Sequence, residues 1–146
     1  MAQHNLATEF YRFAEIYLLG STQVVWMKLV ADLETPVSAM MKIANGEPNS
    51  FLLESVEGGA IRGRYSLIGL RPDIIWRYAD GLTEINRQAQ ITESNFFPCP
   101  VGVTDGPLSS LRSLLAESRI KLPDHLPPMS AGLFGYMSYD AIRLVE

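Results

Sequence analysis

The sequence predicts an α+β protein whose strands pair antiparallel, and three observations support this class. The dipeptide Asp80-Gly81 lies between two runs rich in β-branched and aromatic residues, which is typical of a tight hairpin. Leucines recur at three- and four-residue spacing after Pro107, which predicts an amphipathic helix. With 146 residues, 47% of them hydrophobic, the chain is long enough for one domain with a core.

The first part of the chain predicts a strand and a capped helix, which follow a segment that could be either helical or extended. Residues 10–20 end in glycine and suit either a short helix or an extended arm. Residues 22–32 are rich in β-branched and aromatic side chains and predict a strand. Thr35 suits the N-cap of a helix whose first residue is Pro36, and Asn45-Gly46 is expected to end that helix.

Further strands are expected in the middle of the chain. The apolar runs at 50–55 and 64–70 predict two strands that pair antiparallel, because the residues between them suit a loop. Residues 73–87 then predict a hairpin that turns at Asp80-Gly81, a dipeptide that tolerates positive φ.

The helix that follows Pro107 is expected to bury one face and expose the other. The spacing predicts a buried stripe of leucines, which comprises Leu108, Leu111, Leu114 and Leu115. Four polar residues are expected to lie mostly on the opposite, solvent-facing side: Ser110, Arg112, Ser113 and Glu117.

The end of the chain predicts a linker, a strand and a helix start. Three prolines stiffen residues 121–128 into a linker. The stretch from Ser130 reads as a buried strand in which Gly132 and Gly135 permit close packing, and Asp140 is expected to cap a new helix. The pattern is still apolar where the chain stops, which indicates the front part of a longer protein.

Composition excludes several classes of protein. The net charge of −4, from 12 basic and 16 acidic side chains, gives no support for a nucleic-acid or anionic-membrane surface. No apolar stretch reaches the ~20 residues of a membrane helix, and the N-terminus lacks a secretory pattern. The single cysteine permits no intrachain disulfide and suits a reducing compartment. The expectation is a soluble cytoplasmic protein.

The usual catalytic and metal-binding motifs are absent from the sequence. Cys99 lies between two prolines without a CxxC pattern and is expected to be a small packing residue. His4 and His125 have no patterned carboxylate or cysteine nearby and are expected to be solvated. The sequence rules alone therefore predict no catalytic residues and no metal site.

The stretch FLLESVEGGAIRGRYSLIGL, residues 51–70, combines the chemistry that a free amino acid requires. A carboxylate can meet the ammonium group, and arginine or hydroxyl groups can meet the carboxylate. The residues that supply these groups are Glu54, Ser55, Arg62, Arg64 and Ser66. Because neighbours in a strand point to opposite faces, Ser55 should share a face with Leu53, while Glu54 joins them only where the strand ends or bulges.

A second interpretation of this stretch is an ordinary strand end with solvated charges. Arg62 and Arg64 could pair at the surface with Glu54 and Glu57, which contributes little free energy. Residue chemistry alone favours this second interpretation.

Several motifs in order resemble the N-terminal region of anthranilate synthase component I, one of the chorismate-utilising enzymes. The matching segments are VVWMKLVADLETPVSAMMKI, FLLESVEGG, GRYSLIGLRP and GYMSYD. The resemblance covers residues 23–146, with minor departures at Ala60-Ile61 and Met137. It favours anthranilate synthase over the related aminodeoxychorismate synthase, chiefly through the FLLESVEGG segment.

The resemblance implies a fold of two antiparallel sheets packed as a sandwich with outer helices. It implies that the full-length parent is a lyase that forms anthranilate and pyruvate from chorismate, with Mg²⁺ and with ammonia from a glutamine amidotransferase subunit, component II. The chorismate and metal residues would lie in a C-terminal part beyond residues 1–146. The chain alone is therefore expected to be non-catalytic and to hold no cofactor.

The resemblance also implies a feedback site for L-tryptophan in this region. Ser55 carries over as the principal contact, with Leu53 and Glu54 as wall residues. The remaining residues that carry over are Arg64, Tyr65 and Ser66. Arg62, Glu57 and Asp140 keep their surface or capping roles, and the rest of the site is expected in the missing part.

Two alternatives stay open from the sequence. One is an aminodeoxychorismate synthase, in which the same pocket can hold tryptophan as a structural ligand. The other is a stand-alone amino-acid-binding module. The isolated chain is also expected to self-associate through sheet edges or apolar faces and to bind tryptophan weakly.

Overall fold

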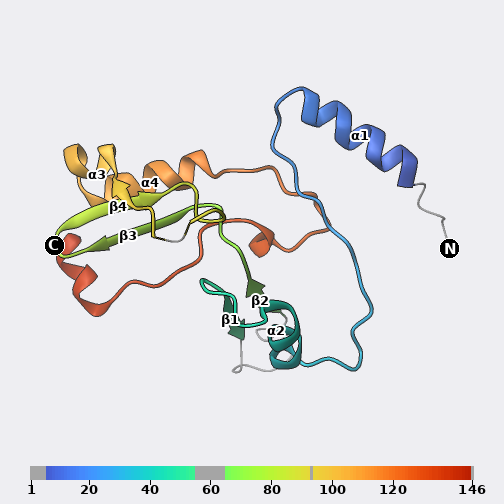
Figure 1. Cartoon of the computed structure of the whole chain (residues 1–146). Helices are drawn as coiled ribbons and strands as arrows, with labels where there is room; N and C mark the ends of the chain where they lie inside the picture. Colours follow the sequence, from blue (N-terminus) through green and yellow to red (C-terminus); the bar gives the residue numbers. More distant parts are fainter. Residues whose placement is uncertain (1–5, 55–64, 93, 146) are drawn as a thin grey trace. The chain divides into compact units, whose positions relative to one another are not determined.

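A computed structural model describes residues 6–54, 65–92 and 94–145 (Figure 1). The chain forms two compact units, Met1–Lys28 with Arg112–Glu146, and Leu29–Leu111. Among its described residues, the second unit contains two small antiparallel sheets, one of two strands and one of three. The predicted α+β class is confirmed, whereas the face-to-face packing of sheets stays a prediction. Within the described ranges, no helix is long and apolar enough to cross a membrane.

The first element is helix α1, Leu6–Leu18, so the helical alternative for this part of the chain is confirmed. Phe13 and Tyr17, four residues apart, stack along it with ring centroids 5.9 Å apart. Gly20 follows with φ +69°, a left-handed conformation that suits glycine at a helix end.

The predicted strand at 22–32 is wrong. In the part of the chain that the structure describes, residues 22–30 make no backbone hydrogen bond to another segment. β-branched and aromatic residues favour a strand because they pack on a partly buried pleated surface. None of the described strands supplies that surface, so the segment remains without regular secondary structure.

Helix α2, Pro36–Ala44, has the predicted caps. Thr35 Oγ1 accepts a hydrogen bond from the Ser38 amide at 3.1 Å, and Ser38 Oγ accepts one from the Thr35 amide at 2.9 Å. This reciprocal capping box satisfies two donors that the first turn leaves free. Asn45, at φ 44°, ends the helix in the left-handed conformation.

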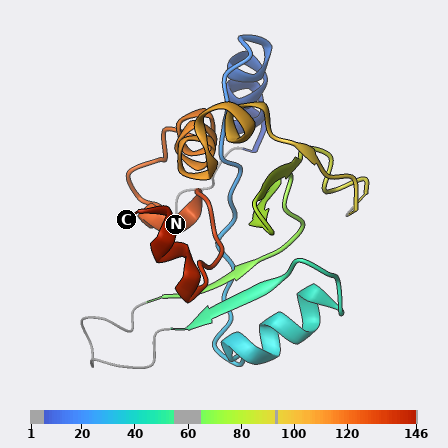
Figure 2. The same cartoon turned by 90° about the vertical axis from the view of Figure 1, so that its left-hand side faces the viewer.

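Strands β1, Phe51–Glu54, and β2, Ser66–Gly69, pair antiparallel as predicted. Helix α2 contacts both strands and lies alongside them in Figure 2. Gly69 lies opposite Phe51, and a Cβ atom on Gly69 would lie 2.1 Å from the Phe51 ring. Glycine at this position therefore leaves room for the aromatic ring across the pair.

The predicted hairpin is also confirmed. Strands β3, Ile75–Ala79, and β4, Leu82–Asn86, pair antiparallel around Asp80 and Gly81, whose φ angles are 52° and 78°. Both values are positive, as a type I′ turn requires. The short strand β5, Phe97–Pro98, pairs with the other edge of β4.

Two helices follow this sheet, α3, Pro100–Asp105, and α4, Pro107–Glu117. Leu114 on α4 is buried as predicted, whereas Leu115 is 47% exposed. Ser110 contradicts its predicted place on the solvent side, because its exposed fraction is only 2%. It lies four residues before Leu114 and therefore shares the buried face of the helix.

The predictions for the end of the chain need correction. Residues 131–138 form no strand, and their side chains are mostly exposed, because no described strand pairs with them. Two short 3₁₀ helices are present, η2, Pro128–Ser130, and η3, Tyr139–Leu144. Ser138, not Asp140, is the N-cap of η3, since Ser138 has the extended backbone that precedes a helix. Asp140 lies in the first turn and pairs with Arg143 at 3.6 Å.

Candidate functional site

Four of the predicted site residues lie at one end of the β1–β2 pair. Leu53 is opposite Leu67, and Glu54 is opposite Ser66, with Tyr65 directly before β2. Glu54 and Ser66 are exposed, and Leu53 and Tyr65 are each 49% exposed. The structure thus brings these four residues together at an open strand end.

The remaining predicted contacts, Ser55 and Arg64, lie outside the described residues, as do Glu57 and Arg62. The described strand β1 ends at Glu54, directly before Ser55. Opposite residues in an antiparallel pair share a face, and neighbours alternate. Leu53 and Leu67 therefore share one face, while Glu54 and Ser66 share the other.

An ion pair that the sequence analysis missed links the two segments that flank the β1–β2 pair. Arg71 donates from Nε to Glu47 Oε2 at 2.7 Å and from Nη2 to Glu47 Oε1 at 2.6 Å. This bidentate contact joins the segment after α2 to the segment after β2. The hydrogen bond from Arg71 holds the pKa of Glu47 below its ordinary value, despite a smaller opposing effect of burial.

Replacing Arg71 by glutamine is expected to raise the pKa of Glu47 towards the ordinary carboxyl value. A carboxylate with a depressed folded-state pKa stabilises the protein above its unfolded-state pKa, and this contribution is lost as the pH falls through the folded-state pKa. The variant should therefore lose stability at neutral pH and show a weaker acid dependence. Carboxyl-carbon NMR titration of Glu47 measures the shift directly.

Arg143→Gln is the matched control, because it removes the same charge from an arginine that pairs with Asp140 instead. The pKa of Glu47 should stay depressed in this variant. An unchanged Glu47 titration in Arg71→Gln would contradict the assigned contact.

Cys99 takes part in a hydrogen-bonded group with Ser110 and Trp76, in which Cys99 and Ser110 are buried and Trp76 is half-buried. Cys99 Sγ lies 3.0 Å from Ser110 Oγ, which accepts a hydrogen bond from Trp76 Nε1 at 2.9 Å. Burial raises the pKa of the Cys99 thiol, but hydrogen bonds from Ser110 and from the Gly102 and Val101 amides outweigh it, so the pKa is lowered.

These contacts join α4 to β3 and to the residue before α3. The burial predicted for Cys99 is confirmed. Its bonded partners are a serine and backbone amides, which suits a packing residue. The four-residue spacing of Ser110 and Leu114 was the sequence signal that could have identified the buried serine.

His125 is exposed, as predicted, and contacts the Trp26 ring with centroids 4.4 Å apart. Across residues 6–54, 65–92 and 94–145, no group of three or more histidine, cysteine or carboxylate side chains could hold a metal ion. The described histidine therefore belongs to an aromatic contact.

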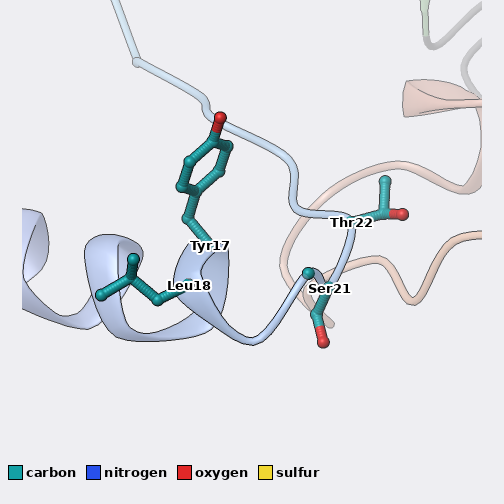
Figure 3. Close-up of a pocket in the computed structure, with 5 residues that line it drawn as sticks. Tyr17, Leu18, Ser21 and Thr22 are labelled. Carbon is teal, nitrogen blue, oxygen red and sulfur yellow. The ribbon is translucent and has the colours of Figure 1, made fainter.

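An open pocket of about 480 Å³ lies at the end of α1 (Figure 3). Its lining consists of Tyr17, Leu18, Gly20, Ser21 and Thr22. The Tyr17 and Leu18 side chains are largely exposed, and the lining contains no carboxylate or cation. This pocket includes none of the residues predicted for the amino-acid site.

No protein-family model matches the chain, and no solved structure matches it. The chain is 49% identical to anthranilate synthase component 1 of Cereibacter sphaeroides over 95% of its own length and 27% of that protein. It is 41% identical to the protein of that name from Synechocystis, over 94% of the chain and 25% of that protein. It is 38% identical to the protein of that name from Pseudomonas aeruginosa, over 80% of the chain and 22% of that protein.

The chain therefore spans about a quarter of the length of these curated relatives. All three share one printed name, and the match extends through almost the whole chain in the first two. These identities support the resemblance drawn from the ordered motifs. The chain is homologous to the N-terminal region of anthranilate synthase component 1.

Proposed function

We propose that this chain serves as the N-terminal, regulatory region of an anthranilate synthase component 1. The 49% identity over 95% of the chain carries this proposal. The whole protein would form anthranilate and pyruvate from chorismate, taking ammonia from a glutamine amidotransferase subunit. The chorismate-binding residues and those that hold Mg²⁺ belong to the remaining part of the protein.

The proposed role of this region is to bind L-tryptophan as a feedback effector. Ser55 would be the principal contact, with Leu53 and Glu54 beside it at the end of β1, and Arg64, Tyr65 and Ser66 would contribute from the start of β2. The meeting of Leu53, Glu54, Tyr65 and Ser66 at one strand end supports this arrangement. Tryptophan would inhibit by binding a low-activity arrangement more tightly than the active one, as allosteric coupling requires.

The two sheets of this chain are proposed to be parts of a larger sandwich in the whole protein. An isolated two-stranded pair such as β1–β2 is marginally stable in water, and further strands or a packed helix are needed. Helix α2 already contacts this pair. Strands from the remaining part of the protein would complete the sheets.

A chimera tests the function. Residues 1–146 replace the matched segment of the Cereibacter sphaeroides relative, and the purified chimera is supplied with chorismate, Mg²⁺ and ammonia. The chimera is expected to release anthranilate, measured by its fluorescence, and tryptophan should inhibit the release. Product chromatography distinguishes anthranilate from aminodeoxychorismate.

The unmodified relative and the 146-residue chain alone are the two controls. The relative should release anthranilate, and the chain alone should release none. A folded chimera that lacks activity, or that releases aminodeoxychorismate, would contradict the proposed function. An active chimera that tryptophan does not inhibit would contradict the regulatory role and leave the synthase assignment in place.

A further inference from the structure

Helix α2 ends at an asparagine that a glycine follows directly, Asn45-Gly46. Asn45 is the C-cap of the helix, with φ 44°, and Gly46 has φ 74°. Both residues are exposed. Within the part of the chain that the structure describes, neither the Asn45 carboxamide nor the Gly46 amide takes part in a hydrogen bond. The carboxamide carbon and the amide nitrogen are therefore free to react with each other.

The surroundings of Gly46 favour such a reaction. A Cβ atom built on Gly46 would meet no atom within 4 Å, so the space beside the backbone is open. Glycine has no side chain of its own and turns about φ and ψ more freely than any other residue. Both properties ease the rotation that brings the Gly46 nitrogen to Asn45 Cγ.

We propose that Asn45 is a site of spontaneous deamidation. The Gly46 nitrogen attacks Asn45 Cγ and forms a new C–N bond, while the bond from Cγ to the side-chain nitrogen breaks. The proton lost from the Gly46 amide leaves with that nitrogen as ammonia, and a five-membered succinimide remains. Water then opens the ring at either carbonyl, which gives aspartate or isoaspartate. Water is the only co-reactant.

Two other asparagines that the structure describes lack this combination of features. Asn49 is also exposed and left-handed, with φ 56°, but Ser50 follows it, and the serine side chain crowds the attacking nitrogen. Asn86 is fully buried, and both ends of its carboxamide are hydrogen-bonded to backbone groups. The expected order of reaction is therefore Asn45, then Asn49, then Asn86.

The modification should weaken the end of α2. Deamidation places a carboxylate at the C-terminus of the helix, where the helix dipole is negative, and close in sequence to Glu47. Isoaspartate also lengthens the backbone by one carbon, so the left-handed cap at this position is lost. Because α2 contacts both β1 and β2, the change falls on the helix that supports this pair.

Storage of the folded chain at neutral and at alkaline pH, with samples taken over time, tests the proposal. Trypsin cleavage after Lys42 and Arg62 releases one peptide that contains both Asn45 and Asn49, so mass spectrometry compares them in one sample. Deamidation at Asn45 should be roughly tenfold or more faster than at Asn49. It should accelerate as the pH rises, because the attacking nitrogen must lose its proton.

Exchanging the residues that follow the two asparagines separates the effect of glycine from that of position. Gly46→Ser should slow deamidation at Asn45 roughly tenfold, and Ser50→Gly should accelerate deamidation at Asn49 by a similar factor. Asn45→Asp reproduces one product and should lower the urea concentration at half-unfolding. Far-UV circular dichroism checks that each variant keeps the fold of the parent.

Three outcomes would overturn the proposal: equal rates at Asn45 and Asn49, an unchanged rate at Asn45 in Gly46→Ser, or deamidation of Asn45 only after urea unfolds the chain. The third would show that the folded end of α2 protects Asn45. Unchanged stability of Asn45→Asp would overturn the expected weakening of α2. None of these results bears on anthranilate formation by the chimera, so the two proposals fail separately.

Discussion

Replacing Ser55 by alanine in the active chimera is expected to weaken tryptophan inhibition about 5- to 150-fold, measured as the inhibitor concentration at half-maximal rate. A buried hydroxyl that contacts a ligand contributes about 1–3 kcal/mol, which corresponds to that range. Anthranilate formation without tryptophan should stay close to that of the parent chimera. The proposed role of Ser55 is to bind the effector, while catalysis belongs to the rest of the protein.

Ser113→Ala is the matched control, because it removes a hydroxyl from the exposed side of α4. Its inhibition by tryptophan should equal that of the parent chimera. If the Ser55→Ala chimera reached half-maximal rate at the same tryptophan concentration as the parent chimera, the assignment of Ser55 would be wrong. Ser66→Ala should weaken tryptophan inhibition less than Ser55→Ala does, since Ser66 is proposed to line the site from the adjoining strand and not to be the principal contact.

Replacing Gly102 by alanine should destabilise the Leu29–Leu111 unit by about 1–3 kcal/mol, the usual range for overpacking. A Cβ atom on Gly102 would lie 2.4 Å from Thr83 Cβ, close to the β4 backbone. Thr83 is buried and cannot rotate its Cβ away, so α3 or β4 must shift. Urea unfolding measured by circular dichroism gives the change in free energy.

Gly135→Ala is the control, since a Cβ atom there meets no atom within 4 Å and the backbone has no positive φ. Its free energy of unfolding should change little or rise slightly, because glycine loses more backbone entropy on folding. In a helix alanine is ordinarily favoured over glycine by about 1 kcal/mol. A stabilised Gly102→Ala variant would therefore contradict the close contact between α3 and β4.

Elements whose stabilising contacts are local were predicted well. The cap of α2 depends on Thr35 and Ser38, three residues apart, and the β3–β4 turn depends on two adjacent residues that accept positive φ. The β1–β2 pair was predicted because a single loop connects two apolar runs. In each case the groups that satisfy the backbone lie within a short stretch of sequence.

Predictions failed where the partner lies far along the chain. The apolar patterns at 22–32 and 131–138 are typical of strands, yet a strand exists only when another strand accepts its hydrogen bonds. Ser110 was assigned to the solvent side by its polarity, but Trp76 and Cys99, both distant in sequence, provide its partners. Periodicity reports which face is apolar and does not report what covers it.

The candidate site divides in the same way. Residue chemistry and ordered motifs predicted Leu53, Glu54, Tyr65 and Ser66 as site residues, and homology supports the family to which those motifs belong. Only the strand register places Leu53 opposite Leu67 and Glu54 opposite Ser66. These two pairs therefore lie on different faces of the β1–β2 pair. The bidentate contact of Arg71 with Glu47 is likewise a tertiary result.

The sequence by itself determined the α+β class, the capped helix, both antiparallel pairs and the resemblance to anthranilate synthase component I. Each of these depends on neighbouring residues or on their order. The tertiary structure decided which apolar segments are paired, which polar side chains are buried, and which faces remain open. The physical reason is that backbone pairing and burial require groups from distant segments, and a local pattern does not specify where those groups lie.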